Sequence, residues 1–198
     1  VLVAEVLAGL ALTKDGWYVD ATYGRGGHST EILARLGEQG RLLALDKDPE
    51  AVADGRKRLG ADARFQIVHA GFEDLRQVAG SWLRGRRAHG VLLDLGVSSP
   101  QLDTPERGFS FMREGPLDMR MDSRLKRTAA DLLNTLPEEE LAPALWELAD
   151  EPDHRRIARL VVDRRATEPV TRTSQLVQIV FEAKGMTAKT WREQQQIG

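Results

Sequence analysis

The strongest constraint on the fold is an alternation of short apolar strands and helices in the first half of the chain. Strand-like runs cover residues 17–22, 41–46, 65–69 and 90–95, and helical patterns cover residues 2–12, 29–36, 49–59 and 73–83. Units of this kind build a parallel sheet with helices on both faces, and strands that are apolar throughout are buried on both sides. We therefore expect an α/β fold.

The second half of the chain follows a different pattern. Residues 97–122 hold three prolines and no sustained period, and loops of this length are usually functional. Residues 128–198 read as helices only, with a capping box at Thr135–Glu138 and helices over 154–166 and 174–183. We expect two domains, 1–122 and 123–198. Because no later strand is predicted, the run 90–95 should leave an open sheet edge.

Composition excludes several classes of protein. The 198 residues include no cysteine, so disulfides, thiol catalysis and zinc–thiolate sites are excluded, and the four histidines lack zinc-ligand spacing. We expect no metal. No apolar run reaches the roughly 18 residues that a membrane span needs, so we expect a cytoplasmic protein without a membrane partner. The net charge of −2 argues against an overall basic coat but allows a local basic face.

A glycine-rich turn is the first candidate binding feature. Gly24, Gly26 and Gly27 lie between a predicted strand and a predicted helix, where backbone N–H groups can meet a polar ligand. A plain tight turn is the alternative. Asp46 closes the second strand 22 residues after Gly24. An acid at this spacing can accept hydrogen bonds from both hydroxyls of an adenosine ribose, although a helix cap or a solvated acid is the alternative. The pattern predicts NAD or S-adenosylmethionine as cofactor.

Two further residues follow later strands. Phe72 comes after the third strand and could cover an adenine ring or pack in the core. Asp94 closes the fourth predicted strand, beside the point where open sheets bind ligands. In amino-group methyltransferases a polar side chain at this place accepts hydrogen bonds from the target amine.

Four segments together resemble one family. DATYGRGGHS, LLALDKDP, LLDLGVSSPQLD and ERGFSFMREGPLDMRMD are similar to the bacterial 16S ribosomal RNA cytosine-N(4) methyltransferases, the RsmH/MraW family. The resemblance implies a Rossmann-like class I methyltransferase sheet with an inserted small helical domain that recognises the substrate. It implies S-adenosylmethionine as cofactor, contacted by Gly26, Gly27, His28, Asp46, Phe72, Asp94 and Gln101.

The resemblance also implies a substrate and a mechanism. The substrate is a decoding-centre cytosine of 16S ribosomal RNA in the small ribosomal subunit, and its N(4) amine receives the methyl group. Asp94 either accepts hydrogen bonds from this amine or serves only the cofactor. Phe109 or Phe111 either stacks on the cytosine or packs in the core. Arg155, Arg156 and Arg159 either hold RNA phosphates or form a solvated face. Because the family continues beyond residue 198, we expect a sequence truncated at its C-terminus.

Two rival functions come from other classes. An NAD-dependent oxidoreductase would share the sheet, but the third glycine of its fingerprint is missing and the helical insert does not fit. A catalytically silent RNA-binding or ribosome-assembly factor would keep the fold, but the intact set of Gly26, Gly27, Asp46 and Asp94 argues against it. The sequence leaves the oligomeric state open, a homodimer included.

Overall fold

A computed structural model describes residues 2–187, which form two compact units. Unit 1 runs to Ser98 and takes in Met121–Ser123, and unit 2 holds Ser99–Arg120 and the residues from Arg124 onward. Each unit has its own hydrophobic core.

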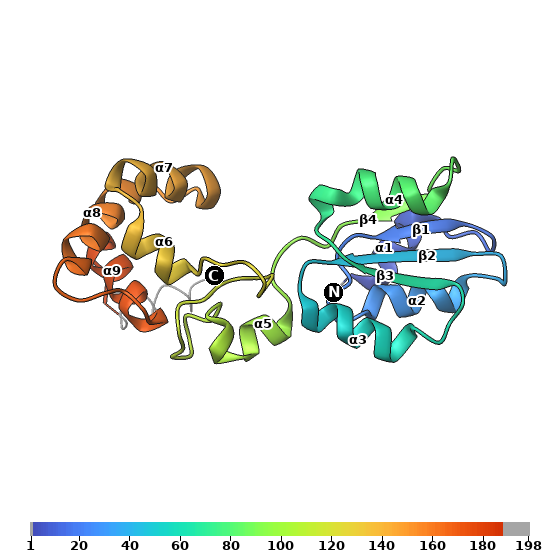
Figure 1. Cartoon of the computed structure of the whole chain (residues 1–198), viewed down its shortest axis with the longest axis horizontal. Coiled ribbons are helices and arrows are strands. Elements are labelled where there is room, and N and C mark those ends of the chain that lie inside the picture. Colours follow the sequence, from blue (N-terminus) through green and yellow to red (C-terminus); the bar gives the residue numbers. More distant parts are fainter. Residues whose placement is uncertain (1, 188–198) are drawn as a thin grey trace. The chain divides into compact units, whose positions relative to one another are not determined.

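Unit 1 is built on a four-stranded parallel sheet (Figure 1). The strands are β1 (Trp17–Asp20), β2 (Arg41–Asp46), β3 (Phe65–His69) and β4 (Gly90–Leu92), in the order β3-β2-β1-β4. Val19 is in register with Leu43 on one side and Val91 on the other. The strand order reverses between β1 and β4, which places the crevice typical of ligand sites at the carboxyl ends of these strands.

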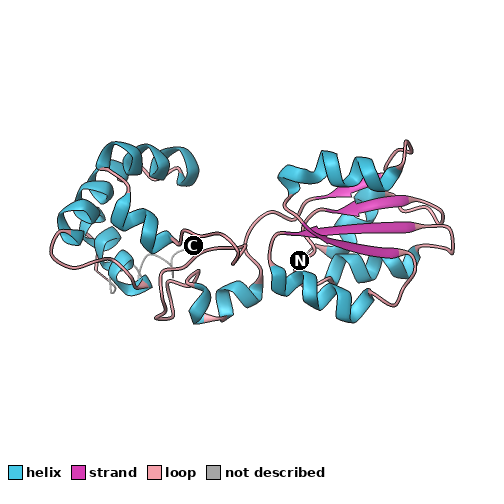
Figure 2. Ribbon diagram, in the orientation of Figure 1, coloured by secondary structure: helices cyan, strands magenta, loops and turns pink. Residues whose placement is uncertain are grey.

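Helices cover both faces of this sheet, as predicted (Figure 2). The helices α1 (Val3–Leu10), α2 (Gly27–Arg35) and α3 (Pro49–Leu59) share one core cluster with Tyr18 and Leu42. The helix α4 (Leu75–Leu83), preceded by the short η1 (Phe72–Asp74), packs with Val19 and Leu43 on the other face. The middle of β2, residues 42–45, is fully buried, because both of its faces are covered.

The first and fourth strands are shorter than predicted, and the expected run 17–22 ends at Asp20. The expected run 90–95 ends at Leu92, and the last ladder bond joins the Ala21 amide to the Leu92 carbonyl at 2.9 Å. Because β1 itself ends at Asp20, the backbone beyond Leu92 has no strand to pair with, so Asp94 lies in the following loop and not at a strand end. No described strand pairs with the other side of β4, and Val91 is 43% exposed there.

Unit 2 is helical, as expected. It contains α5 (Ser99–Asp103), η2 (Pro105–Arg107), α6 (Ala129–Thr135), α7 (Glu138–Ala149), α8 (His154–Arg165) and α9 (Thr173–Lys184). The long loop therefore carries two short helices that the sequence pattern did not predict. The capping box was also misplaced: it joins Thr128 and Asp131 at the start of α6, whereas the Thr135 hydroxyl donates to a carbonyl within that helix.

The segment 99–120 belongs to unit 2. Leu117, 2% exposed, belongs to the core that Leu133, Ile157 and Ile179 form, and the Leu117 amide donates to the Thr171 carbonyl at 2.8 Å. The packing therefore places the boundary between the two units near residue 98, whereas the sequence predicts a domain boundary after residue 122. The division into functional domains 1–122 and 123–198 stays a prediction.

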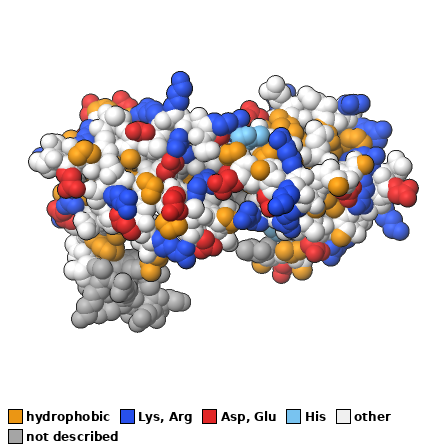
Figure 3. All heavy atoms as spheres, turned by 60° about the horizontal axis from the view of Figure 1, so that its bottom comes forward, with side chains coloured by type: hydrophobic (Ala, Val, Ile, Leu, Met, Phe, Trp, Pro, Cys, Tyr) orange, Lys and Arg blue, Asp and Glu red, His pale blue; other side chains and the backbone are white. Residues whose placement is uncertain are grey.

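The surface carries charges of both signs. On the face drawn in Figure 3, basic and acidic side chains are interspersed over each unit, in keeping with the small net charge. In the described part of the chain, no helix is long and apolar enough to cross a membrane.

Candidate cofactor and substrate site

The glycine turn is fastened at several points to the carboxyl edge of the sheet. The Tyr23 amide donates to the Leu45 carbonyl at 3.0 Å, which draws the turn over the end of β2. Gly24 and Gly26 have φ values of 56° and 71°, in the left-handed region that residues other than glycine rarely adopt. Gly26 caps the start of α2, so the turn leads directly into the first residues of that helix.

Asp46 lies beside this turn, as its spacing predicted. One carboxylate oxygen accepts the Gly24 amide at 2.8 Å and the other accepts the Asp48 amide at 2.9 Å. The helix-cap role belongs to Asp48, which accepts the Glu50 amide at 3.0 Å. A carboxylate has about four acceptor positions, so Asp46 keeps capacity for two further donors such as ribose hydroxyls. Partial burial raises the pKa of Asp46, while the two amide bonds lower it.

His28 and Asp94 meet at the first turn of α2. The His28 Nδ1 lies 3.8 Å from an Asp94 carboxylate oxygen. The Asp94 amide donates to the Thr22 hydroxyl at 2.7 Å, although these residues are 72 positions apart. The His28 side chain is 11% exposed and that of Asp94 is 54% exposed. A solvent-accessible carboxylate is therefore held at the N-terminus of α2, next to the glycine turn.

Sequence reasoning missed Asp20 as a member of this site. Asp20 closes β1 and is fully buried, where it accepts the Ser29 hydroxyl at 2.7 Å and the Thr22 amide at 3.2 Å. Burial raises the pKa of Asp20, while the bonds from Ser29 and Thr22 and the nearby His28 lower it. Asp20 thus ties the glycine turn to α2. The sequence signal was weak, because Asp20 lies inside the predicted run 17–22 and closes β1 only in the structure, whereas Asp46 closes its run in both.

The remaining predicted residues differ in their surroundings. Phe72 opens η1 with 45% of its surface exposed, and the Lys47 ammonium lies 5.3 Å from its ring centre. This exposure argues against a core role and leaves the predicted adenine contact open. Gln101 is buried in α5 of unit 2, and its contact with the cofactor stays a prediction.

The predicted RNA-binding arginines lie on one face of α8. Ile157, Ala158 and Val161 are buried in the unit 2 core, while Arg155, Arg156 and Arg159 are exposed. Of the two candidate stacking residues, Phe111 is 63% exposed and Phe109 is half-buried. Within residues 2–187, no group of three or more His, Asp or Glu side chains is placed to hold a metal ion.

Comparison with known proteins adds a family to this geometry. The sequence profile of the MraW methylase family matches residues 1–195. A curated protein of Thioalkalivibrio sulfidiphilus, named ribosomal RNA small subunit methyltransferase H, is 53% identical over 183 residues, which are 92% of this chain and 58% of that protein. Proteins of the same name from Methylococcus capsulatus and Coxiella burnetii are 52% and 49% identical and are matched over 61% and 60% of their lengths.

Proposed function

Because the chain belongs to the MraW methylase family, we propose that it forms the cofactor-binding and substrate-recognition parts of a ribosomal RNA methyltransferase. The enzyme uses S-adenosylmethionine and methylates the N(4) amine of a decoding-centre cytosine in 16S ribosomal RNA. The chain spans about 60% of the length of the curated relatives it matches, so this activity is proposed for the complete protein.

The residues at the carboxyl edge of the sheet fit the proposed cofactor. S-adenosylmethionine supplies a methyl group bound to a positively charged sulfonium. Asp46 has acceptor capacity for the ribose hydroxyls, and its bond to the Gly24 amide keeps the turn and the acid together. Gly26 and Gly27 allow close approach of the backbone, and the exposed Phe72 ring offers a flat surface for adenine.

One observation carries the choice of cofactor: the Asp94 carboxylate lies at the N-terminus of α2, 3.8 Å from His28 Nδ1. In the rival NAD-binding arrangement, a diphosphate binds at the N-terminus of this helix. A carboxylate at that place would repel a diphosphate, whereas it attracts a cationic sulfonium and can accept hydrogen bonds from an amine. This position favours S-adenosylmethionine.

Asp94 is the residue we assign to the target amine. The lone pair of the N(4) amine is delocalised into the cytosine ring, so the amine is a weak nucleophile until a hydrogen-bond acceptor orients it. The Thr22 hydroxyl holds the Asp94 backbone, and the carboxylate is accessible. Methylation forms an N–C bond while the S–C bond breaks, and the amine releases one proton.

The RNA is expected to contact the helical unit as well. A cytosine must leave its stack before its amine can enter an active site. The exposed arginines of α8 would hold phosphates of the same RNA, and their positive charge makes this binding dependent on salt.

The test is transfer of a labelled methyl group to small-subunit ribosomal RNA by the complete protein. We expect Asp94→Ala to abolish or strongly reduce transfer while the fold persists, because alanine keeps the backbone amide that bonds to Thr22. Glu31→Ala is the control, since it removes a carboxylate of similar exposure from α2. Unchanged transfer by Asp94→Ala would remove Asp94 from the mechanism. Cofactor binding without any transfer by the wild type would favour a silent RNA-binding factor.

A further inference from the structure

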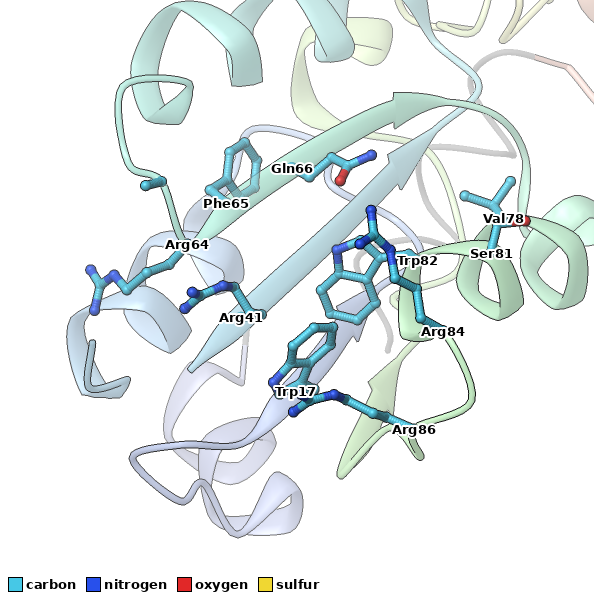
Figure 4. Close-up of a pocket in the computed structure, with 11 residues that line it drawn as sticks. Trp17, Arg41, Arg64, Phe65, Gln66, Val78, Ser81, Trp82, Arg84 and Arg86 are labelled. Atoms are coloured by element: carbon cyan, nitrogen blue, oxygen red, sulfur yellow. The ribbon is translucent and has the colours of Figure 1, made fainter. Parts of the chain in front are cut away.

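A pocket of about 710 Å³ opens at the amino ends of the strands, away from the glycine turn. Trp17, Arg41 and Phe65 are the first residues of β1, β2 and β3, and all three line it. The last turns of α4 and the loop after it complete the pocket with Trp82, Arg84 and Arg86, among others (Figure 4). We call it the amino-edge pocket.

The amino-edge pocket is separate from the proposed cofactor site. Arg41 begins β2 and Asp46 ends it, so the two are about 17 Å apart along a strand that rises about 3.3 Å per residue. A ligand in this pocket therefore cannot be the nucleotide that reacts. The pocket can only hold a ligand that binds at a distance from the reaction.

The pocket has an excess of positive charge. Four arginines line it, and no Asp or Glu is among the described residues that do so. Arg64 is paired with Asp62 at 2.7 Å. In residues 2–187, no carboxylate lies within 4.0 Å of the guanidinium nitrogens of Arg41, Arg84 or Arg86. Among the described residues, the Arg41 guanidinium donates to two backbone carbonyls, at 2.7 and 2.8 Å.

Aromatic rings lie next to these charges. The ring centres of Trp17 and Trp82 are 4.7 Å apart with an interplanar angle of 49°, and the guanidinium carbon of Arg86 lies 4.9 Å from the Trp17 ring centre. Figure 4 shows the two indoles side by side, with Arg84 and Arg86 reaching them from the loop after α4. Unpaired guanidinium groups beside indole rings fit phosphates and unstacked bases, the two groups that a single-stranded nucleic acid presents together. An acidic peptide would satisfy the charges but would leave the indoles without a flat partner.

We infer that the amino-edge pocket binds a single-stranded segment of the RNA substrate, at a distance from the nucleotide that is methylated. The identity of this ligand rests on the proposed function. The pocket would anchor the RNA through Arg84 and Arg86, with bases stacked on Trp17 and Trp82.

The experiment compares two double variants of the chain. Arg84→Gln with Arg86→Gln removes two unpaired charges from the pocket, and Arg56→Gln with Lys57→Gln removes two exposed charges from α3 as a matched control. Binding of a fluorescent single-stranded oligoribonucleotide is measured by anisotropy over a range of salt concentrations. We expect Kd to rise roughly tenfold in the pocket variant alone. For the pocket variant, the slope of log Kd against log salt concentration should fall by about 0.7 for each phosphate that it no longer binds.

Several results would overturn the inference. These are an unchanged Kd and slope in the pocket variant, an equal loss of affinity in the control, or no binding of the oligoribonucleotide by the wild type. A duplex of the same sequence that binds as tightly through the same arginines would exclude the single-strand assignment. Cofactor affinity is measured in parallel and should not change. Failure of the proposed function would appear instead in the methyl-transfer assay, whatever the pocket variant does.

Discussion

Replacing two adjacent glycines, Gly26 and Gly27, one at a time with alanine separates the role of the glycine turn in folding from its role in binding. Gly26 has a φ of 71°, and a methyl group there would lie 2.8 Å or less from three atoms of the Tyr23 side chain. Gly27 is the first residue of α2, and apart from its chain neighbours and the nearby backbone of α2, no atom of the described residues lies within 4 Å of a methyl group added to it. The first substitution should disturb the fold, and the second should not.

The expected magnitudes follow from these surroundings. The left-handed conformation of Gly26 costs an alanine about 1–2 kcal/mol. Tyr23 is 3% exposed and packs against Phe65 with ring centres 6.1 Å apart, so moving its ring should cost about 1–3 kcal/mol more. Gly27→Ala should instead leave the free energy of unfolding unchanged or raise it by about 0.4–1 kcal/mol, because it restricts the unfolded chain.

Binding should respond differently from stability at Gly27. If S-adenosylmethionine approaches the turn closely, the methyl group of Gly27→Ala takes the space it needs, and affinity should fall tenfold or more, about 1.4 kcal/mol. Urea unfolding measures stability, and calorimetric titration measures affinity. Gly80→Ala in α4 is the control, because its methyl group also meets no described atom within 4 Å beyond its chain neighbours and the nearby backbone of α4. Wild-type affinity in Gly27→Ala would refute the assignment of this turn to the cofactor.

Two other predictions concern pH and salt. The raised pKa of Asp20 means that the folded chain holds this proton more tightly than the unfolded chain. The free energy of unfolding should therefore decline as pH rises from 3.8 towards the raised value, and Asp20→Asn should lack this part of the decline. Parallel wild-type and variant curves in urea unfolding at a series of pH values would contradict this. Replacing Arg155, Arg156 and Arg159 with Gln should lower the salt slope of RNA binding by about 0.7–0.9 for each phosphate that these arginines bind. Cofactor affinity should stay the same, and an unaltered slope would leave these arginines as a solvated face.

Elements with strong local signals were predicted with their bounds. β2, α3 and β3 begin and end at the expected residues, because an apolar run or a helical period is limited there by charged or turn-forming residues. The predicted end of β4 was wrong, because the length of a strand depends on the neighbouring strand with which it pairs. Leu93 is apolar enough for a strand, but β1 stops at Asp20 and provides no further partner.

In the candidate site, too, local contacts could be predicted and buried contacts could not. Asp46 and the glycine turn could be paired from the sequence, because a strand, a turn and a helix of fixed length bring them together. The buried bond between Asp20 and Ser29 was hidden, because nothing local shows which acid at a strand end will be covered.

Contacts between distant segments were decided by the tertiary structure alone. By itself, the sequence determined the α/β alternation, the acid beside the glycine turn and the family. The tertiary structure decided that Asp94 bonds to Thr22 and lies near His28, and that Trp17 and Trp82 share a pocket with arginines. Periodicity and turn chemistry act over a few residues. The order of strands in a sheet depends on long-range pairing, and several orders would bury the same apolar residues.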